Sequence, residues 1–147
     1  MEKVISEERI SRLKKEFLQG FVKSCGIQLD SLKRGRAESV LEIKGVHSQQ
    51  DGFVHAGVMA TMADHTAGYA AFSLVSEDFR ILTLEFKINF LRPATGEWLV
   101  CRAQVVKKGR NILVAESEVY DQRADTEKLA AKALVTLMAV PAKELRT

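Results

Sequence analysis

Residues 58–75, Val-Met-Ala-Thr-Met-Ala-Asp-His-Thr-Ala-Gly-Tyr-Ala-Ala-Phe-Ser-Leu-Val, form the longest apolar run of the chain. Asp64 and His65 stand at its middle, and an acid and an imidazole at the centre of a bilayer would be costly. The run is also marginally short for a membrane span, so it predicts a buried helix. Because this helix is apolar on nearly all sides, we expect a sheet to curl around it.

A two-residue period follows the helix and indicates a strand. Leu82, Leu84, Phe86, Ile88 and Phe90 are predicted to share one face, and Thr83, Glu85, Lys87 and Asn89 the other. Residues 98–106, 112–120 and 129–140 also have strand character, with turn residues between them. Together these segments predict a four-stranded antiparallel meander, and residues 36–44 predict one further strand before the helix.

The N-terminal segment carries the signals of a short helix. Residues 6–8, Ser-Glu-Glu, resemble an N-cap followed by first-turn acids, and Gly20 resembles a stop. Between these signals the apolar residues recur at helical spacing: Ile10, Leu13, Phe17 and Phe21. We expect this amphipathic helix to pack on the parent domain.

These elements predict an α+β fold in one domain, residues 1–147. Residues 1–35 supply the N-terminal helix and a lead-in, and residues 36–140 supply the core. A five-stranded antiparallel sheet wrapped around the central helix is the simplest packing. An open edge strand would be a pairing hazard, so we expect dimerisation by sheet continuation or by helix contact.

Composition narrows the function classes. The 147 residues are 46% apolar and 28% charged, and this apolar content excludes a disordered chain. The net charge is +3, and the charges are interspersed, so the sequence does not show the clustered basic surface of a nucleic-acid-binding protein. Cys25 and Cys101 lie far apart and suggest neither a disulfide framework nor a zinc site. The first residues lack a secretory signal core, so we expect a cytoplasmic protein with no membrane partner. His47, His55 and His65 lack metal-ligand spacing, so no metal or other cofactor is expected.

Asp64 is the most informative candidate for chemistry. Its helical neighbours at three and four residues include no Lys or Arg, so its carboxylate must find a partner elsewhere, be held protonated or line a wet cavity. In a cavity it could act as a general base or a nucleophile. Gly57 lies at the predicted helix start, where free N–H groups can stabilise an oxyanion. The two residues are about 10 Å apart along the axis, so we expect Asp64 to act from a neighbouring subunit or through a water.

Residues 47–68 and 82–94 carry a family resemblance. The stretch His-Ser-Gln-Gln-Asp-Gly-Phe-Val-His-Ala-Gly, the acid seven residues later, and Leu-Thr-Leu-Glu-Phe-Lys-Ile-Asn-Phe-Leu-Arg-Pro-Ala resemble the PaaI-like acyl-CoA thioesterases of the hotdog-fold superfamily. The match covers roughly residues 36–140. Ala56 stands where these enzymes usually have glycine, and its N–H is retained.

The resemblance implies a hotdog fold, with an antiparallel sheet of five to six strands around a long central helix. It also implies a homodimer that pairs into a dimer of dimers, and acyl-CoA as substrate. It implies that Asp64 is the general base or nucleophile and that Gly57 N–H, across the dimer interface, holds the thioester carbonyl. Gln49 would orient the water or carbonyl, His55 belongs to the same motif, and Thr83 would assist the acid. Substrate contacts are expected from these residues: Ala56, Phe90, Lys107, Lys108, Gly109, Arg110 and Asn111, of which the last five form a basic turn suited to the anionic nucleotide.

Two other functions compete with hydrolysis. A hotdog hydratase or dehydratase would need a catalytic His paired with a helix acid, and His55 with Asp64 could imitate that pair. The other alternative is a noncatalytic acyl-CoA-binding protein. The apolar residues around the site do not indicate which acyl group is bound.

Overall fold

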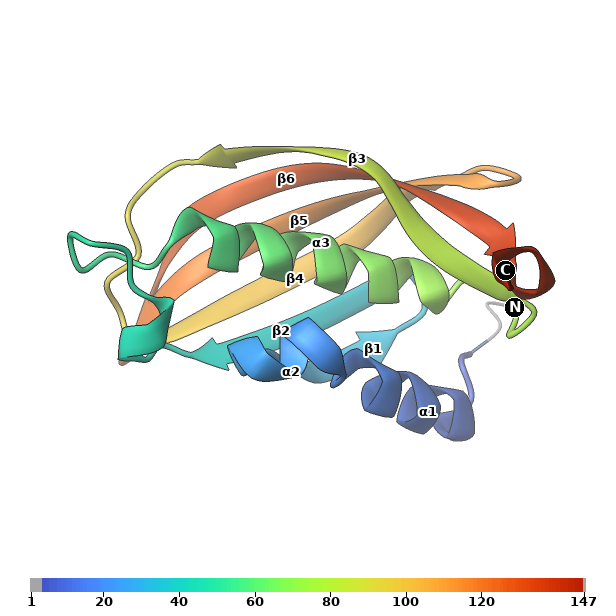
Figure 1. Cartoon of the computed structure of the whole chain (residues 1–147), viewed down its shortest axis with the longest axis horizontal. Helices are drawn as coiled ribbons and strands as arrows, with labels where there is room; N and C mark the ends of the chain where they lie inside the picture. Colours follow the sequence, from blue (N-terminus) through green and yellow to red (C-terminus); the bar gives the residue numbers. More distant parts are fainter. Residues whose placement is uncertain (1–3, 147) are drawn as a thin grey trace.

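The computed structural model describes residues 4–146 as one antiparallel sheet with a long helix on its inner face (Figure 1). In chain order the elements are α1 (Glu7–Phe17), α2 (Gly20–Cys25), β1 (Gln28–Lys33), β2 (Arg36–Glu42), a 3-10 turn (Gly45–His47), α3 (Ala56–Phe72), β3 (Phe79–Phe90), β4 (Trp98–Lys108), β5 (Ile112–Arg123), β6 (Thr126–Pro141) and a last 3-10 turn (Ala142–Leu145). The expected α+β hotdog fold is confirmed.

The sheet has six strands in the order β1-β2-β4-β5-β6-β3. The four-stranded meander is therefore wrong in one respect, because β3 pairs with β6 at the far edge and only β4, β5 and β6 follow one another. The lead-in also contributes a strand that the sequence pattern did not predict, β1, which pairs with β2. Its residues show little burial alternation, so the two-residue period is weak there.

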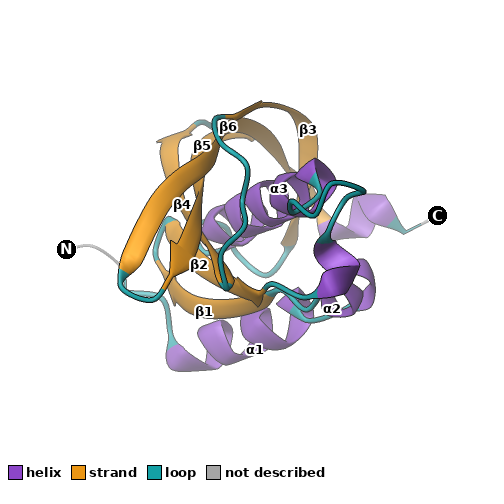
Figure 2. Cartoon of the chain, turned by 90° about the vertical axis from the view of Figure 1, so that its left-hand side faces the viewer, coloured by secondary structure: helices purple, strands orange, loops and turns teal. Residues whose placement is uncertain are grey.

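The core lies between the inner face of the sheet and α3 (Figure 2). Seen along the helix, the sheet curves around α3, while α1 and α2 lie beside the β1 edge. A buried polar seam joins the two layers: Ser117 Oγ donates to Ala63 O at 2.7 Å, and the hydroxyls of Ser39 and Thr66 are hydrogen-bonded at 2.7 Å. These paired groups define one registration of the helix on the sheet.

Helix α1 starts as predicted and ends earlier. Ser6 Oγ accepts from Arg9 N–H at 3.1 Å, which confirms the N-cap. The helix ends at Phe17, and Gly20 begins α2 instead of closing α1. Phe21 was expected on the buried face and is 69% exposed, because the break before Gly20 rotates it away from Leu13 and Phe17.

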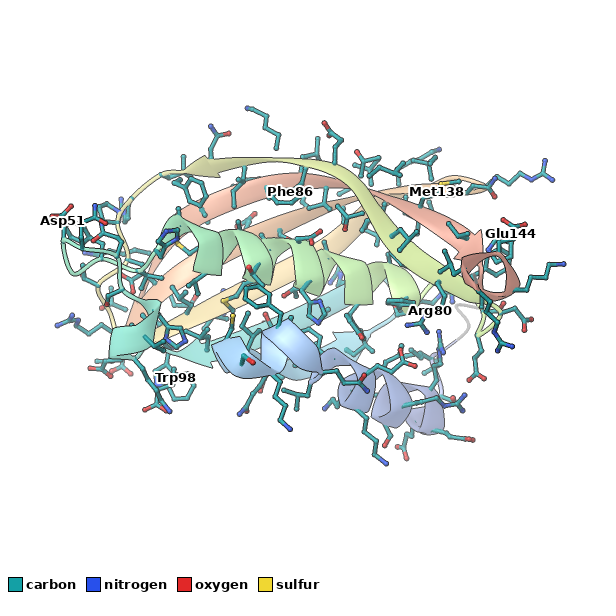
Figure 3. The ribbon with its side chains drawn as sticks, in the orientation of Figure 1. Asp51, Arg80, Phe86, Trp98, Met138 and Glu144 are labelled. Carbon is teal, nitrogen blue, oxygen red and sulfur yellow. The ribbon has the colours of Figure 1, made fainter. Side chains whose placement is uncertain are left out.

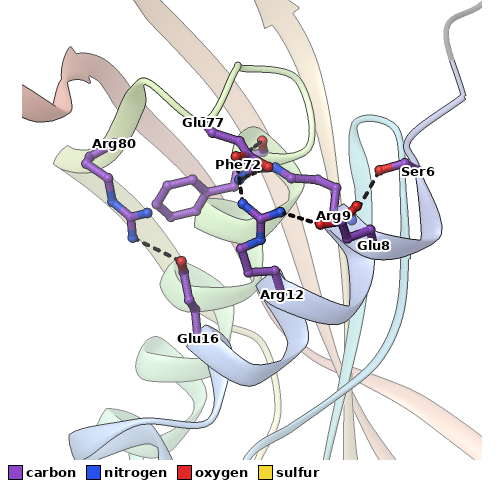
Figure 4. A network of polar contacts seen from close by, with 8 residues as sticks. All are labelled: Ser6, Glu8, Arg9, Arg12, Glu16, Phe72, Glu77 and Arg80. Carbon is purple, nitrogen blue, oxygen red and sulfur yellow. Dashed lines mark hydrogen bonds and ion pairs between the residues drawn. The ribbon is translucent and has the colours of Figure 1, made fainter.

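Charged contacts hold α1 against the end of α3 and the start of β3 (Figure 4). Arg12 pairs with Glu77 at 2.6 Å, and an Arg9 N–H donates to Phe72 O at 3.4 Å. Arg80 pairs with Glu16 at 3.1 Å, and its guanidinium lies over the Phe72 ring. The N-terminal helix is thus part of the same packed unit as the sheet.

Candidate active site

The loop before α3 is held by a buried histidine. His47 Nδ1 accepts from Lys44 N–H at 2.9 Å, and its Nε2 lies 2.6 Å from Cys25 O, so Nε2 must be the donor to this carbonyl. The side chain is buried and both ring nitrogens are used. His47 therefore supports the loop and is not placed for chemistry. Asp51 lies at the tip of this loop, at the opposite end of the molecule from Glu144 (Figure 3).

His55 caps the start of α3. Its Nδ1 accepts from Gly57 N–H at 2.8 Å, and Ala56 is the first residue of the helix, so its own N–H has no acceptor within α3. A Cβ built on Gly57 would lie 3.0 Å from that nitrogen. The position of His55 Nδ1 therefore shows where an acceptor of the Gly57 N–H lies. Only glycine at position 57 keeps this acceptor at an ordinary van der Waals distance from the side chain. Since His55 is exposed, a carbonyl oxygen could take this place if the ring rotated away.

Thr83 reaches Asp64. Thr83 Oγ1 donates to Asp64 Oδ1 at 2.6 Å, and Asp64 is half-buried on α3. A hydroxyl donating to one carboxylate oxygen orients the group and leaves the other oxygen free. The structure thus joins the two residues that the resemblance pairs.

A β-bulge explains how Thr83 faces the helix. Thr83 pairs with Leu137 and Glu85 with the next residue, Thr136, so Leu84 is the extra residue between them. Thr83 and Phe86 both lie opposite buried residues and share the helix-facing side. The predicted alternation, which placed Leu82 with Phe86 and Thr83 on the other face, is therefore wrong.

Gly57 and Asp64 lie on one side of α3, seven residues apart. At 1.5 Å per residue this separation is about 10 Å, which is too far for one carbonyl to touch both groups. Gln49, at the other side of the loop, accepts through its side-chain oxygen from Asp51 N–H and Phe53 N–H. Its carbonyl end is thus engaged in the loop.

The expected substrate contacts fall into two places. Phe90 lies at the end of β3 and is half-exposed on the helix-facing side, opposite buried Ala131. The basic turn, residues 107–111, joins β4 to β5 at the end of the sheet where α3 terminates, away from Gly57 (Figure 1). The Gly57 N–H therefore lies at the start of α3, the Asp64 carboxylate lies near its middle, and the basic turn between β4 and β5 lies near its end.

The third histidine is structural. His65 Nε2 donates to Phe17 O, 3.1 Å away, and its ring packs against Phe17 and Tyr69. Burial lowers the pKa of His65. No group of three or more His, Cys, Asp or Glu side chains among residues 4–146 is placed to hold a metal ion. Nor is any helix in that range long and apolar enough to cross a membrane.

Sequence reasoning missed three cations near the basic turn. Lys33, Arg34 and Arg36 form the β1–β2 turn, and Gly35 O accepts from Val105 N–H on β4 at 2.9 Å. The only local signal is an Arg-Gly-Arg triplet. Their neighbourhood depends on the pairing of β2 with β4, which no sequence pattern of the chain predicts.

Comparisons with known proteins identify the family. The model of the thioesterase superfamily matches residues 51–128, and the chain belongs to this superfamily. A 1,4-dihydroxy-2-naphthoyl-CoA hydrolase of Listeria monocytogenes is 28% identical over 110 residues, which are 75% of this chain and 87% of the relative.

Solved structures are similar over nearly the whole chain. A thioesterase family protein of Silicibacter pomeroyi is 40% identical with a TM-score of 0.87, covering 91% of this chain and 99% of that protein. A thioesterase of Haemophilus influenzae, 23% identical with a TM-score of 0.83 over 93% of this chain and 94% of that one, shares the fold. The chain is accordingly a thioester hydrolase of the hotdog type.

Proposed function

We propose that this hydrolase cleaves acyl-CoA to a free acid and CoA, with Asp64 as the reacting carboxylate. The observation that carries the proposal is the Thr83 hydrogen bond to Asp64 on a helix that has no other acid. A carboxylate held in one orientation beside apolar surface is suited to remove a proton from water or to attack a carbonyl. The naphthoyl-CoA hydrolase among the relatives supports a CoA ester as the substrate class.

The distance between Gly57 and Asp64 supports a site shared by two subunits. Strand β3 is an edge strand of 12 residues with exposed apolar side chains, among them Leu84 at 54% exposure. Pairing two such edges would continue the sheet and cover this surface. It would also bring the Asp64 of one subunit toward the Gly57 of the other, which completes the site.

A second interface would use the outer face of the sheet. One part of this face is apolar, where Leu82 and Ile112 both lie opposite Met138. Leu134, nearby on β6, is half-exposed. We propose that two dimers meet here, giving a dimer of dimers. The molar mass in solution, measured by light scattering, should be four times that of the chain.

The reaction follows from these positions. His55 rotates away, and the thioester oxygen accepts from Gly57 N–H, where the negative charge of the tetrahedral intermediate develops. Asp64 takes a proton from water while the water oxygen bonds to the carbonyl carbon; alternatively an Asp64 oxygen attacks first, and water then cleaves the resulting anhydride. In both routes the C–S bond breaks and the CoA thiolate leaves. In the first route the thiolate takes up the proton held by Asp64, and in the second it takes up a proton of the water that cleaves the anhydride, so Asp64 ends as a carboxylate in both. The products are the acid and CoA.

A hydratase role has less support. It would need the His55 imidazole as the base beside the substrate. His55 Nδ1 instead accepts the Gly57 N–H, and His55 lies nine residues, about two and a half turns, before Asp64 on the same chain. The motif histidine thus contacts the N–H group that we propose as the oxyanion donor.

The test is thiol release from short, long and aromatic acyl-CoA esters. Wild type should release thiol from at least one class, and Asp64→Asn, which keeps an acceptor for Thr83, should lower kcat about a hundredfold or more. Asp125→Asn, in the exposed β5–β6 turn, is the matched control and should match wild type. Turnover by Asp64→Asn near that of wild type would refute the role of Asp64. Binding of every ester without thiol release would instead favour the noncatalytic alternative.

A further inference from the structure

Asp121, near the end of β5, anchors the loop between β3 and β4. Its Oδ2 accepts from Thr95 N–H at 3.0 Å, and its Oδ1 accepts from Gly96 N–H at 2.8 Å. Within residues 4–146 Asp121 forms no ion pair, so its charge is met by backbone N–H groups. Hydrogen bonds to an ionised acceptor are stronger than those between neutral groups. Asp121 therefore fixes two consecutive peptide groups of this loop.

The loop is closely fitted to the end of β5. A Cβ built on Gly96 would lie 2.5 Å from Gln122 O and closer still to Asp121 Oδ1, so only glycine allows this approach. Arg123, two residues after Asp121, donates from its guanidinium to Thr95 O. The end of β5 thus holds the loop through both its N–H and its C=O groups.

The same loop contacts the segment that leads into α3. Ala94 O accepts from Val54 N–H at 3.0 Å, and both residues are buried. Val54 is followed by His55, whose Nδ1 accepts from Gly57 N–H at 2.8 Å. Two contacts therefore connect Asp121 with the start of α3: the one between its carboxylate and residues 95–96, and the one between residues 94 and 54.

The contact between Val54 and Ala94 is the external support of the loop before α3. Within the described chain, the other hydrogen bonds of residues 48–54 stay inside residues 45–55. A displacement of Ala94 would therefore move Val54 and the entry of the chain into α3. The direction of the Gly57 N–H depends on that entry.

We propose that Asp121 is a positioning residue for thioester hydrolysis. By fixing residues 95–96 it keeps Ala94 against Val54, and so keeps the Gly57 N–H aimed at the thioester oxygen. This inference rests on the proposed function, in which that N–H is the oxyanion donor. An oxyanion donor acts over a narrow range of distances, about 2.7–3.1 Å, so a small displacement of the helix start lowers the rate.

Asp121→Asn tests this role by kinetics. The amide keeps one oxygen acceptor and replaces the other by an NH2 group, which cannot accept from a backbone N–H. We expect kcat for the best acyl-CoA ester to fall about tenfold with KM little changed, because the loop contact acts on the transition state through Gly57. Asp125→Asn removes the same charge from the exposed β5–β6 turn and should match wild type. A loss that appears only in KM would overturn the proposal.

A double-mutant cycle separates positioning from a general loss of stability. In the Gly57→Ala protein the donor is already crowded, so adding Asp121→Asn should lower kcat/KM by less than about threefold. Arg123→Gln, which removes only the contact with Thr95 O, should lower kcat in the wild-type background by about threefold. Losses from Asp121→Asn that are equal in both backgrounds would overturn the proposal.

Amide hydrogen exchange follows the same path without substrate. Val54 N–H is buried and hydrogen-bonded, so it is protected in wild type. Asp121→Asn should speed its exchange about tenfold and leave Val135 N–H, in the centre of β6, unchanged. Unchanged exchange at Val54, in an enzyme whose wild type hydrolyses acyl-CoA, would refute the role of Asp121. Faster exchange at Val54, in a protein that hydrolyses no ester, would confirm the loop contact and refute the proposed function.

Discussion

Gly57→Ala tests whether the start of α3 holds the thioester oxygen. The added Cβ would lie 3.0 Å from His55 Nδ1 and 3.3 Å from its Cε1, which is tighter than ordinary van der Waals contact. Any oxygen that replaces Nδ1 on the Gly57 N–H would meet the same methyl group. The substitution therefore crowds the donor without removing it.

The effect on stability should be small. Losing the His55 cap would cost about 1 kcal/mol. Replacing glycine by alanine within a helix contributes up to about 1 kcal/mol in the opposite direction. The two effects offset each other, so the free energy of unfolding should change by less than about 1 kcal/mol. Urea unfolding of both proteins measures this difference.

The effect on catalysis should be larger. Removing an oxyanion donor costs about a hundredfold to a thousandfold, and crowding one should lower kcat/KM by about tenfold to a hundredfold. Thiol release from the best acyl-CoA ester measures the ratio. Gly45→Ala is the control, since its Cβ would meet nothing within 4 Å. A Gly57→Ala enzyme within about threefold of wild type, with unchanged stability, would refute the oxyanion role of this N–H.

Three further predictions concern the groups around the site. Thr83→Val removes the hydroxyl that orients Asp64 and should lower kcat about tenfold, whereas Thr83→Ser should retain most activity; steady-state kinetics compares them, and equal loss would contradict an orienting role. Burial lowers the pKa of His65 below its ordinary 6.5, so the unfolded chain binds more protons than the folded chain near and below this pH. The free energy of unfolding should therefore decrease as the pH is lowered below about 6.5. His65→Gln should weaken this pH dependence in urea unfolding at about pH 7 and about pH 5, and an unchanged dependence would exclude His65 as its source. Burial also raises the pKa of Cys101 to about 12, so a thiol reagent should label at most one cysteine per native chain, the half-buried Cys25, and both after unfolding.

Local patterns of the chain were sufficient for several features. The apolar run around Asp64 predicts α3 because its composition is that of a fully covered helix, and it is buried on most sides. Ser6 predicts the start of α1 because a hydroxyl there can accept a free N–H, as it does from Arg9. The turn at Gly109 and the strands on either side follow from glycine and from the two-residue period.

Long-range pairing was decided only in the tertiary structure. The position of β3 beside β6, the strand β1, and the neighbourhood of Gly35 and Val105 depend on contacts between distant segments, which carry no local signal. The bulge at Leu84 is of the same kind. A strict alternation sends Thr83 away from the helix, and one extra residue in the ladder turns it toward Asp64.

The sequence by itself therefore determined the fold class, the acid on the helix and the glycine at the helix start, because these depend on residue type and short spacing. The tertiary structure decided that Thr83 donates a hydrogen bond to Asp64 and that His55 accepts one from Gly57 N–H. It also decided that the β1–β2 and β4–β5 turns lie near the end of α3. The physical reason is that a strand register and a sheet order are selected by the packing of the whole sheet around α3, and a shift of one residue would reverse which side chains face the helix.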